Sequence, residues 1–183
     1  MTSAPSPSAL YRPLLLGIVT GLRSQLSVAV LAWSEPASAR DTRALRLLRS
    51  TPGRSIVALA AAGEIVGDKL PSTPSRLSPM VLGARLATGA AVGALAVGSV
   101  DRRTLALASA VGVAGAAAGS YAGAAYRKAL PARTHTPDLP WALGEDIVAA
   151  GLAATAVKVW PEPRSWWQRA PRAVGRTVTF WRR

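Results

Sequence analysis

The stretch "TLALASAVGVAGAAAGSYAGAAY" (Thr104–Tyr126) contains no charged side chain over its whole length. A helix that crosses a bilayer needs roughly 20 apolar residues. This stretch is built from Ala and Gly rather than from large side chains. Close packing of small residues is how helices associate in lipid, where apolar side chains gain little by leaving an apolar solvent. The stretch therefore predicts a membrane-spanning helix, and an all-α helical bundle for the chain.

Four other segments are long and apolar enough to be candidate spans. These four segments are 13–33, 55–70, 80–100 and 139–160. Together with 104–126 they predict a domain of about five transmembrane helices that spans residues 13–160. Residues 1–12 are expected to form a flexible N-terminus, and 161–183 a basic, Trp-rich cytoplasmic tail. Trp33, Trp141 and Trp160 lie at segment ends, where indole rings prefer the headgroup layer.

The composition separates two explanations of a strongly basic chain. A net charge of +13 suits either a nucleic-acid binder or a membrane protein with basic cytoplasmic loops. The basic residues cluster between long uncharged runs, and no basic face is interleaved with stacking aromatics. We therefore expect the lipid bilayer as partner and no nucleic acid. The absence of Cys excludes disulfides and thiolate chemistry.

Catalytic signatures are missing from the sequence. It has no H-E-x-x-H zinc helix, no G-x-S-x-G nucleophile turn and no phosphate-binding loop. The single histidine, His135, falls in a predicted external loop, where it is expected to be a solvated loop residue. We expect no enzyme, no metal and no cofactor.

The distribution of Lys and Arg predicts the orientation. With the N-terminus outside, 14 of the 22 basic residues are cytoplasmic, six are external, and Arg23 and Arg85 lie within segments. Because positive charge resists translocation, this count favours a bacterial plasma-membrane protein with the N-terminus outside and the C-terminus cytoplasmic. A cleavable signal peptide is an alternative for the first segment, since "ASA" at 37–39 imitates a cleavage site. Two features argue against a signal peptide: Arg23 interrupts the apolar stretch, and the imitated cleavage site lies far beyond the end of that stretch.

Two basic segments are predicted to lie on the membrane surface. In "RDTRALRLLRS" (40–50) a helical projection puts Arg43, Arg46 and Arg49 on one side and the leucines on the other. Such an interfacial amphipathic helix is expected to hold its arginines near anionic lipid headgroups, and the C-terminal tail to do the same. The simpler alternative for both segments is topology control and anchoring.

Glycines recur at a spacing of four residues in four of the segments. The pairs or series are Gly17 and Gly21, Gly63 and Gly67, Gly89 and Gly93, and Gly115, Gly119 and Gly123. This spacing stacks the missing side chains on one helix face, so that neighbouring backbones can approach closely. The pattern predicts a tight bundle, and a homo-oligomer is one of the expected arrangements.

The stretch "GEIVGDKLP" (63–71) places charge in an apolar segment. Glu64 and Asp68 lie on adjoining helical turns, and a charge at mid-bilayer costs about 2.5–3.5 kcal/mol. Arg23 and Arg85 share the small, polar faces of their segments and are the natural partners. We therefore predict a buried polar cluster of Glu64, Asp68, Arg23 and Arg85, with Lys69 reaching the surface near the helix end.

Glu145 is a further candidate for this cluster. "GEDIVAAGLA" (144–153) repeats the order Gly, Glu, Ile, Val of "GEIV". The alternative is that acidic residues in a first turn complement the helix dipole. Glu145 and Asp146 point about 100° apart on a helix, so only one of them is expected at the site, and we favour Glu145.

Several of these stretches together resemble a known family. "GLRSQLS" (21–27), "GEIVGDKLP", "GARLATGAAVGA" (83–94) and "GEDIVAAGLA" resemble the bacterial integral-membrane family called domain of unknown function 4126. The resemblance spans roughly residues 15–160, and the E-x-x-x-D-K-x-P element is its most specific part. It implies a small multi-helix membrane protein, and it brings no established reaction or ligand.

Two functions remain open at this stage. The first is transport or permeation of a small ion or solute through the polar cluster, with Glu64, Asp68, Lys69, Arg23, Arg85 and Glu145 as binding candidates. The alternative is a structural or accessory membrane subunit whose buried ion pairs only hold its helices together.

Overall fold

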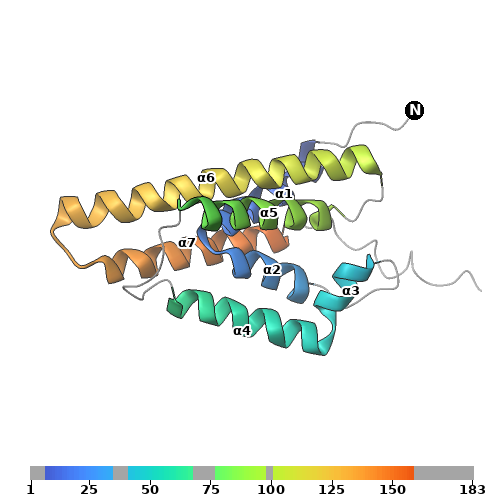
Figure 1. Cartoon of the computed structure of the whole chain (residues 1–183), viewed down its shortest axis with the longest axis horizontal. Helices are drawn as coiled ribbons and strands as arrows, with labels where there is room; N and C mark the ends of the chain where they lie inside the picture. The colour runs from blue at the N-terminus through green and yellow to red at the C-terminus, as the bar shows by residue number, and fades with distance from the viewer. Residues whose placement is uncertain (1–6, 35–40, 68–76, 98–100, 159–183) are drawn as a thin grey trace, which may run out of the picture.

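The computed structural model describes residues 7–34, 41–67, 77–97 and 101–158. Within these ranges the chain forms only helices and no strand, which confirms the all-α prediction (Figure 1). The seven helices are α1 (Pro7–Leu22), α2 (Ser24–Trp33), α3 (Arg43–Arg49), α4 (Thr51–Gly67), α5 (Pro79–Ala96), α6 (Arg102–Thr134) and α7 (Asp138–Lys158).

Helices α1 and α2 form a V-shaped hairpin rather than one span (Figure 1). Arg23, between them, has an extended backbone with φ −143° and ψ 99°. Arg12, in the first half of α1, donates a hydrogen bond of 3.3 Å to the hydroxyl of Ser34, just past the end of α2. The chain therefore turns back at Arg23, and the single span predicted at 13–33 is wrong. Helix α1 also begins at Pro7, within the predicted flexible N-terminus.

Apolar periodicity did not reveal this turn because both arms are apolar. The sequence feature that indicates the turn is the group of polar residues around Arg23. Ser24 and Ser27 bond locally to the backbone and so offer it an alternative to a continuous helix. The hydroxyl of Thr20 donates across the turn to that of Ser27 at 2.7 Å.

Two of the described helices, α5 and α6, are long and apolar enough to cross a membrane. The predicted second segment forms α4 with 17 residues, and the first is divided between two shorter helices. Helix α7 has a suitable length but carries Glu145 and Asp146 in its interior. A bundle of five separate spans is therefore not established, and α5 and α6 alone fit length and composition.

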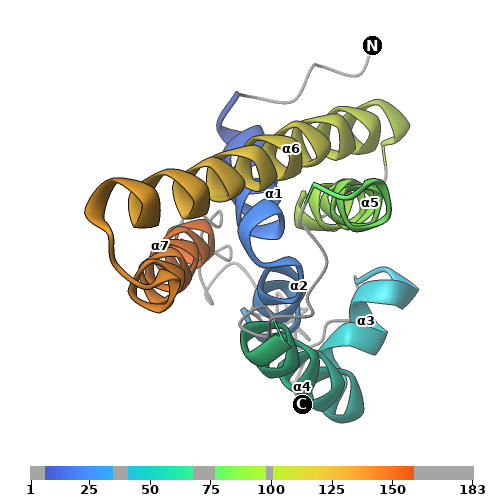
Figure 2. The same cartoon turned by 60° about the vertical axis from the view of Figure 1, so that its left-hand side comes forward.

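Helix α6 is the centre of the packing, since α1 and α5 both pack against it, and α1 crosses it at a steep angle in Figure 2. Glycines make these contacts possible. A Cβ atom at Gly17 would lie 2.5 Å from the carbonyl oxygen of Gly112, and one at Gly115 would lie 2.7 Å from that of Leu14. Gly63 and Gly67 differ, because nothing lies within 4 Å of a Cβ built there. The glycine pair in α4 therefore makes no close helix contact within the described chain.

The surface-helix prediction for 40–50 holds only in part. Helix α3 spans Arg43–Arg49, and the side chains of Arg43 and Arg46 are exposed. Arg49 is 3% exposed, pairs with Asp41 at 2.9 Å and donates to the carbonyl of Leu31. Its prediction as a lipid-headgroup contact is wrong, because the guanidinium instead binds the last turn of α2. The C-terminal tail lies outside the described residues.

Arg12 is a second buried arginine, and it falls at the end of the predicted flexible N-terminus. It is 3% exposed and donates to the carbonyl of Ala96, at the end of α5. With its bond to Ser34, it joins α1, α2 and α5 at one end of the molecule. Ala156 of α7 belongs to the same apolar core cluster as Leu31 of α2.

Candidate functional site

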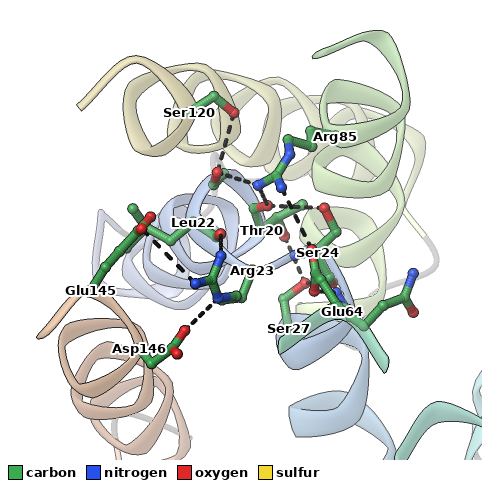
Figure 3. A network of polar contacts seen from close by, with 12 residues as sticks. Thr20, Leu22, Arg23, Ser24, Ser27, Glu64, Arg85, Ser120, Glu145 and Asp146 are labelled. Carbon is green, nitrogen blue, oxygen red and sulfur yellow. Dashed lines mark hydrogen bonds and ion pairs between the residues drawn. The ribbon is translucent and has the colours of Figure 1, made fainter. Parts of the chain in front are cut away.

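The turn at Arg23 creates a hydrogen-bonding problem inside the protein. The last carbonyls of α1 and the first N–H groups of α2 have no partners within their own helices. Buried backbone groups of this kind are almost always bonded, because leaving one unbonded costs about 1–3 kcal/mol. Arg23 itself is 1% exposed. The groups that bond to this backbone come from α4, α5 and α6, and α7 binds the side chain of Arg23 (Figure 3).

Glu64 binds the start of α2. Its two carboxylate oxygens accept hydrogen bonds of 2.8 Å from the backbone N–H groups of Ser24 and Gln25. A carboxylate at a helix N-terminus satisfies free N–H donors and complements the helix dipole. The unusual feature is that this capping group comes from another helix, 40 residues along the chain.

Arg85 binds the end of α1. The guanidinium, on a residue 6% exposed, donates to the carbonyl of Gly21 at 2.5 Å, and Ser120 of α6 donates to the same oxygen at 3.4 Å. Arg85 also lies 3.6 Å from Glu64, measured from Nη2 to Oε1. The predicted meeting of these two residues is therefore present. Their side chains are in direct contact and bridge both arms of the hairpin.

Arg23 turns away from Glu64 and toward α7. Its Nε donates to Asp146 at 2.5 Å, and its Nη2 lies 4.0 Å from Oε2 of Glu145 (Figure 3). The predicted pairing of Arg23 with Glu64 is thus replaced by a pairing with α7. The expectation that only Glu145 would reach the site is also wrong. A long guanidinium can contact two carboxylates that point 100° apart.

Arg127 of α6 extends the ion pairs beyond Arg23. Its Nη1 lies 3.8 Å from the same Oε2 of Glu145, and its Nε donates to Asp138 at 2.8 Å. We call Arg23, Arg85, Glu64, Glu145 and Asp146 the apex network, because all of them surround the hairpin turn. Arg127 and Asp138 lie at its edge.

A cavity of about 360 Å³ borders the apex network on the side of α7. It lies among α1, α6 and α7, and its walls are almost wholly apolar. The charged residue in its lining is Glu145, and its other members include Ile18, Leu22, Ala122, Tyr126 and Leu152. Near Glu64 and Arg85 the side chains touch directly, and this cavity does not reach them.

The remaining predicted site residues, Asp68 and Lys69, lie outside the described residues. Sequence reasoning missed Ser120 and Arg127, and it set Asp146 aside. The sequence indicates a site role for Ser120 only weakly, because this residue follows Gly119 on the face of α6 that packs against α1. Among the described residues, no group of three His, Asp or Glu side chains is arranged to hold a metal ion.

Comparisons with family models, with curated proteins and with solved structures find no match to this chain. The resemblance to domain of unknown function 4126 therefore stays a prediction.

Proposed function

We propose that this chain is a multi-pass protein of the bacterial plasma membrane that moves a small ion or charged solute past the apex network. One observation carries the proposal. A buried hairpin turn has its backbone ends bound by Glu64 and Arg85, and its own Arg23 bound by α7. In membrane proteins, irregular backbone at membrane depth is tolerated where it is buried in protein or lines a cavity. Interrupted helices of this kind often form ion and solute sites.

The outer surfaces of the peripheral helices support the membrane setting. Ile56 and Leu59 of α4 are 65% and 73% exposed, and Ile147 and Val148 of α7 are 73% and 55% exposed. Side chains of this size exposed in rows suit a lipid-facing surface. Glu145 and Asp146 of the same helix contact Arg23.

The hairpin revises the proposed orientation. The start of α1, the end of α2, the start of α6 and the end of α7 lie at one end of the molecule (Figure 1). The described basic residues at that end are Arg12, Arg43, Arg46, Arg49, Arg54, Arg102, Arg103 and Lys158, against Arg127, Lys128 and Arg133 at the other. By the positive-inside rule we propose that both termini are cytoplasmic, in place of an external N-terminus.

A structural clasp is the second candidate, and a specific observation favours it. Glu64 makes direct contact with Ser24, Gln25 and Arg85. Such contacts hold helices together without any solute. We therefore assign different roles to these residues. Glu64 and Arg85 hold the hairpin in place, and Glu145, which borders the cavity, binds the solute.

Flux measurements with matched variants test this division. The purified protein is placed in liposomes, a membrane potential is imposed with a K⁺ gradient and valinomycin, and a potential-sensitive dye reports its decay. Protons, Na⁺, Cl⁻ and tetraphenylphosphonium are supplied in turn as the permeant ion. We expect faster decay than in empty liposomes with at least one of them.

The variants distinguish transport from a clasp. Glu145→Gln should keep the folding yield and abolish the flux, whereas Glu64→Gln should lower the yield. Asp138→Asn is the control, because its carboxylate is 49% exposed and its pairing with Arg127 is a surface pair. No flux with any of the four ions, together with a loss of yield in Glu145→Gln, would leave only the clasp.

A further inference from the structure

A groove between α6 and α7 opens on the outer surface of the protein. It is the cavity of about 360 Å³ that Glu145 borders, and Figure 1 shows its two walls, α6 and α7, running in opposite directions. Ala122 of α6 and Val148 of α7 line the groove and are exposed, so a ligand can enter between these helices. Since Val148 also belongs to the exposed apolar surface of α7, the groove is continuous with the surface proposed to face lipid.

The lining of the groove selects a hydrocarbon. Apart from Glu145, its residues are Ala, Gly, Ile, Leu, Val and Tyr. Oε2 of Glu145 is buried and lies 3.8 Å from Arg127 and 4.0 Å from Arg23, so almost no polar surface faces the groove. A polar group that loses its water without gaining a hydrogen bond is destabilised. The part of a ligand that fills the groove must therefore be apolar.

The position of the groove along α6 matches one leaflet of a bilayer. The lining residues of α6 run from Ala118 to Tyr126, which is roughly 12 Å along a helix. One half of a hydrocarbon core is roughly 15 Å thick. At the outer end, Tyr126 packs edge-on against Trp141, with 6.2 Å between ring centroids, and such rings prefer the headgroup boundary. The groove therefore has the length and the level of an acyl chain in the leaflet on that side.

A basic residue lies in line with the groove beyond this boundary. Arg133 follows Tyr126 by seven residues, as Tyr126 follows Gly119 of the lining. Seven residues are nearly two full turns, so all three lie on one face of α6. Arg133 is exposed, roughly 10 Å farther along the helix than Tyr126. A phosphate attached to a chain in the groove would lie at this level, and a guanidinium group binds phosphate by charge-assisted hydrogen bonds.

From these features we propose that the groove binds one phospholipid, with an acyl chain between α6 and α7 and the phosphate at Arg133. This proposal rests on the membrane setting of the proposed function and does not depend on transport. The acyl chain would close the lipid-facing side of the cavity, so that a solute reaches Glu145 from the side of Arg127. A helix of a second copy of the chain is the competing occupant, and it would need no phosphate.

Two lipids with the same acyl chains test the role of the phosphate. Dioleoylphosphatidylglycerol carries the phosphate, and dioleoylglycerol lacks it. Each is titrated onto the full-length, delipidated protein in detergent micelles, and native mass spectrometry gives the fraction of protein that has bound lipid. We expect one saturable site for the phosphatidylglycerol, and binding of dioleoylglycerol that is weaker by about threefold or more. Equal binding of the two lipids would overturn the proposal.

Two substitutions on α6 locate the acyl chain. Ala122→Phe fills the groove from its exposed wall and should weaken phosphatidylglycerol binding by about tenfold or more. Ala110→Phe adds the same ring at an exposed position outside the lining, roughly 18 Å away along the helix, and should leave binding unchanged. Equal effects of the two substitutions would contradict the assignment to this groove.

Two further substitutions on α6 locate the phosphate. Arg133→Gln removes the charge in line with the groove and should weaken phosphatidylglycerol binding by about threefold to fivefold. Lys128→Gln removes one charge at an exposed position about 200° around the helix from Tyr126, and it should leave binding unchanged. Binding of dioleoylglycerol should be the same in both variants. An equal loss of phosphatidylglycerol binding in the two variants would overturn the placement of the phosphate.

The same spectra report whether two copies of the chain associate. A dimer that Ala122→Phe converts to a monomer would make the groove an interface between copies and overturn the proposal. The flux assay in liposomes separates this proposal from the proposed function. Lipid binding at the groove without flux of any ion would contradict transport and support the lipid site. Flux without lipid binding at the groove would contradict the lipid site and support transport.

Discussion

The carboxylate of Glu64 accepts a hydrogen bond of 2.8 Å from the backbone N–H of Ser24, 40 residues earlier in the chain. Through this bond a side chain of α4 caps the first turn of α2. Since Arg85 binds the last turn of α1 and also approaches Glu64, the two residues complete the backbone hydrogen bonding of one turn. The hairpin and the buried charges thus depend on each other.

Removal of the Glu64 carboxylate should destabilise the hairpin. In Glu64→Ala the N–H groups of Ser24 and Gln25 lose their acceptors, and Arg85 loses a counter-charge. Unsatisfied buried donors cost about 1–3 kcal/mol each, so we expect a clearly lower free energy of unfolding. Thermal unfolding in detergent, followed by circular dichroism, measures the change. Asp138→Asn should shift it by less than about 1 kcal/mol. Equal shifts in the two variants would refute the capping role.

The pair of Arg23 and Asp146 should show strong energetic coupling. Arg23 is 1% exposed and Asp146 is 18% exposed on its side chain, so Asp146→Asn leaves a buried guanidinium with less compensation. Removal of one partner of a buried pair costs about 3–5 kcal/mol. A double-mutant cycle of Arg23→Gln and Asp146→Asn should therefore give a large coupling energy. Additive effects would mean that the two side chains do not interact.

Two glycine-to-alanine substitutions should differ clearly in their effect on stability. A Cβ atom at Gly112 would overlap the carbonyl oxygen of Gly89, so Gly112→Ala must push α5 and α6 apart. Overpacking of this kind typically costs about 1–3 kcal/mol. Gly63→Ala meets nothing within 4 Å and should be neutral, or stabilising by about 0.5–1 kcal/mol. Thermal unfolding of both variants checks the prediction, and destabilisation by Gly63→Ala alone would contradict the packing.

Asp101 provides a pH-dependent contribution at the start of α6. The backbone N–H of Thr104, and then its hydroxyl, donate to the carboxylate and lower the pKa of Asp101 below its usual value of 3.8. A group whose folded-state pKa is lowered stabilises the fold above the unfolded pKa and loses this effect as the pH falls through the folded pKa. Asp101→Ala should therefore lower the unfolding temperature at pH 7 and change it little near pH 2. A difference that stays the same at both pH values would rule out this cap.

The sequence predicted the all-α class, the helical character of the later segments and the meeting of Glu64 with Arg85. These features follow from apolar periodicity and from the cost of isolated charge in an apolar setting. The turn at Arg23 was missed, because an extended residue between two apolar arms leaves almost no trace in periodicity. The error carried over to the predicted partner of Arg23, which had been worked out for a straight helix.

Arg12 and Arg49 show a second limit of sequence reasoning. Arg12 falls in the predicted flexible N-terminus and Arg49 in the predicted surface helix, yet each is 3% exposed and donates to a carbonyl at the end of another helix. Only the tertiary arrangement decides whether an arginine near a helix end meets lipid headgroups or a neighbouring backbone. Asp146 was set aside for a related reason. The prediction considered the directions in which Glu145 and Asp146 point from the helix, but it did not consider that the long side chain of Arg23 can contact both.

Cysteine accessibility tests the reversal of the chain at Arg23 most directly, and the natural sequence contains no Cys. Single substitutions Thr2→Cys, Thr51→Cys and Thr136→Cys report the region before α1, the start of α4 and the region between α6 and α7. A membrane-impermeant maleimide is applied to intact cells and to inside-out vesicles. With the proposed orientation, the hairpin predicts that positions 2 and 51 react from the same, cytoplasmic side and position 136 from outside. Labelling of position 2 from outside, with position 51 reactive only from the cytoplasm, would mean that residues 13–33 cross the membrane once, and would contradict the account.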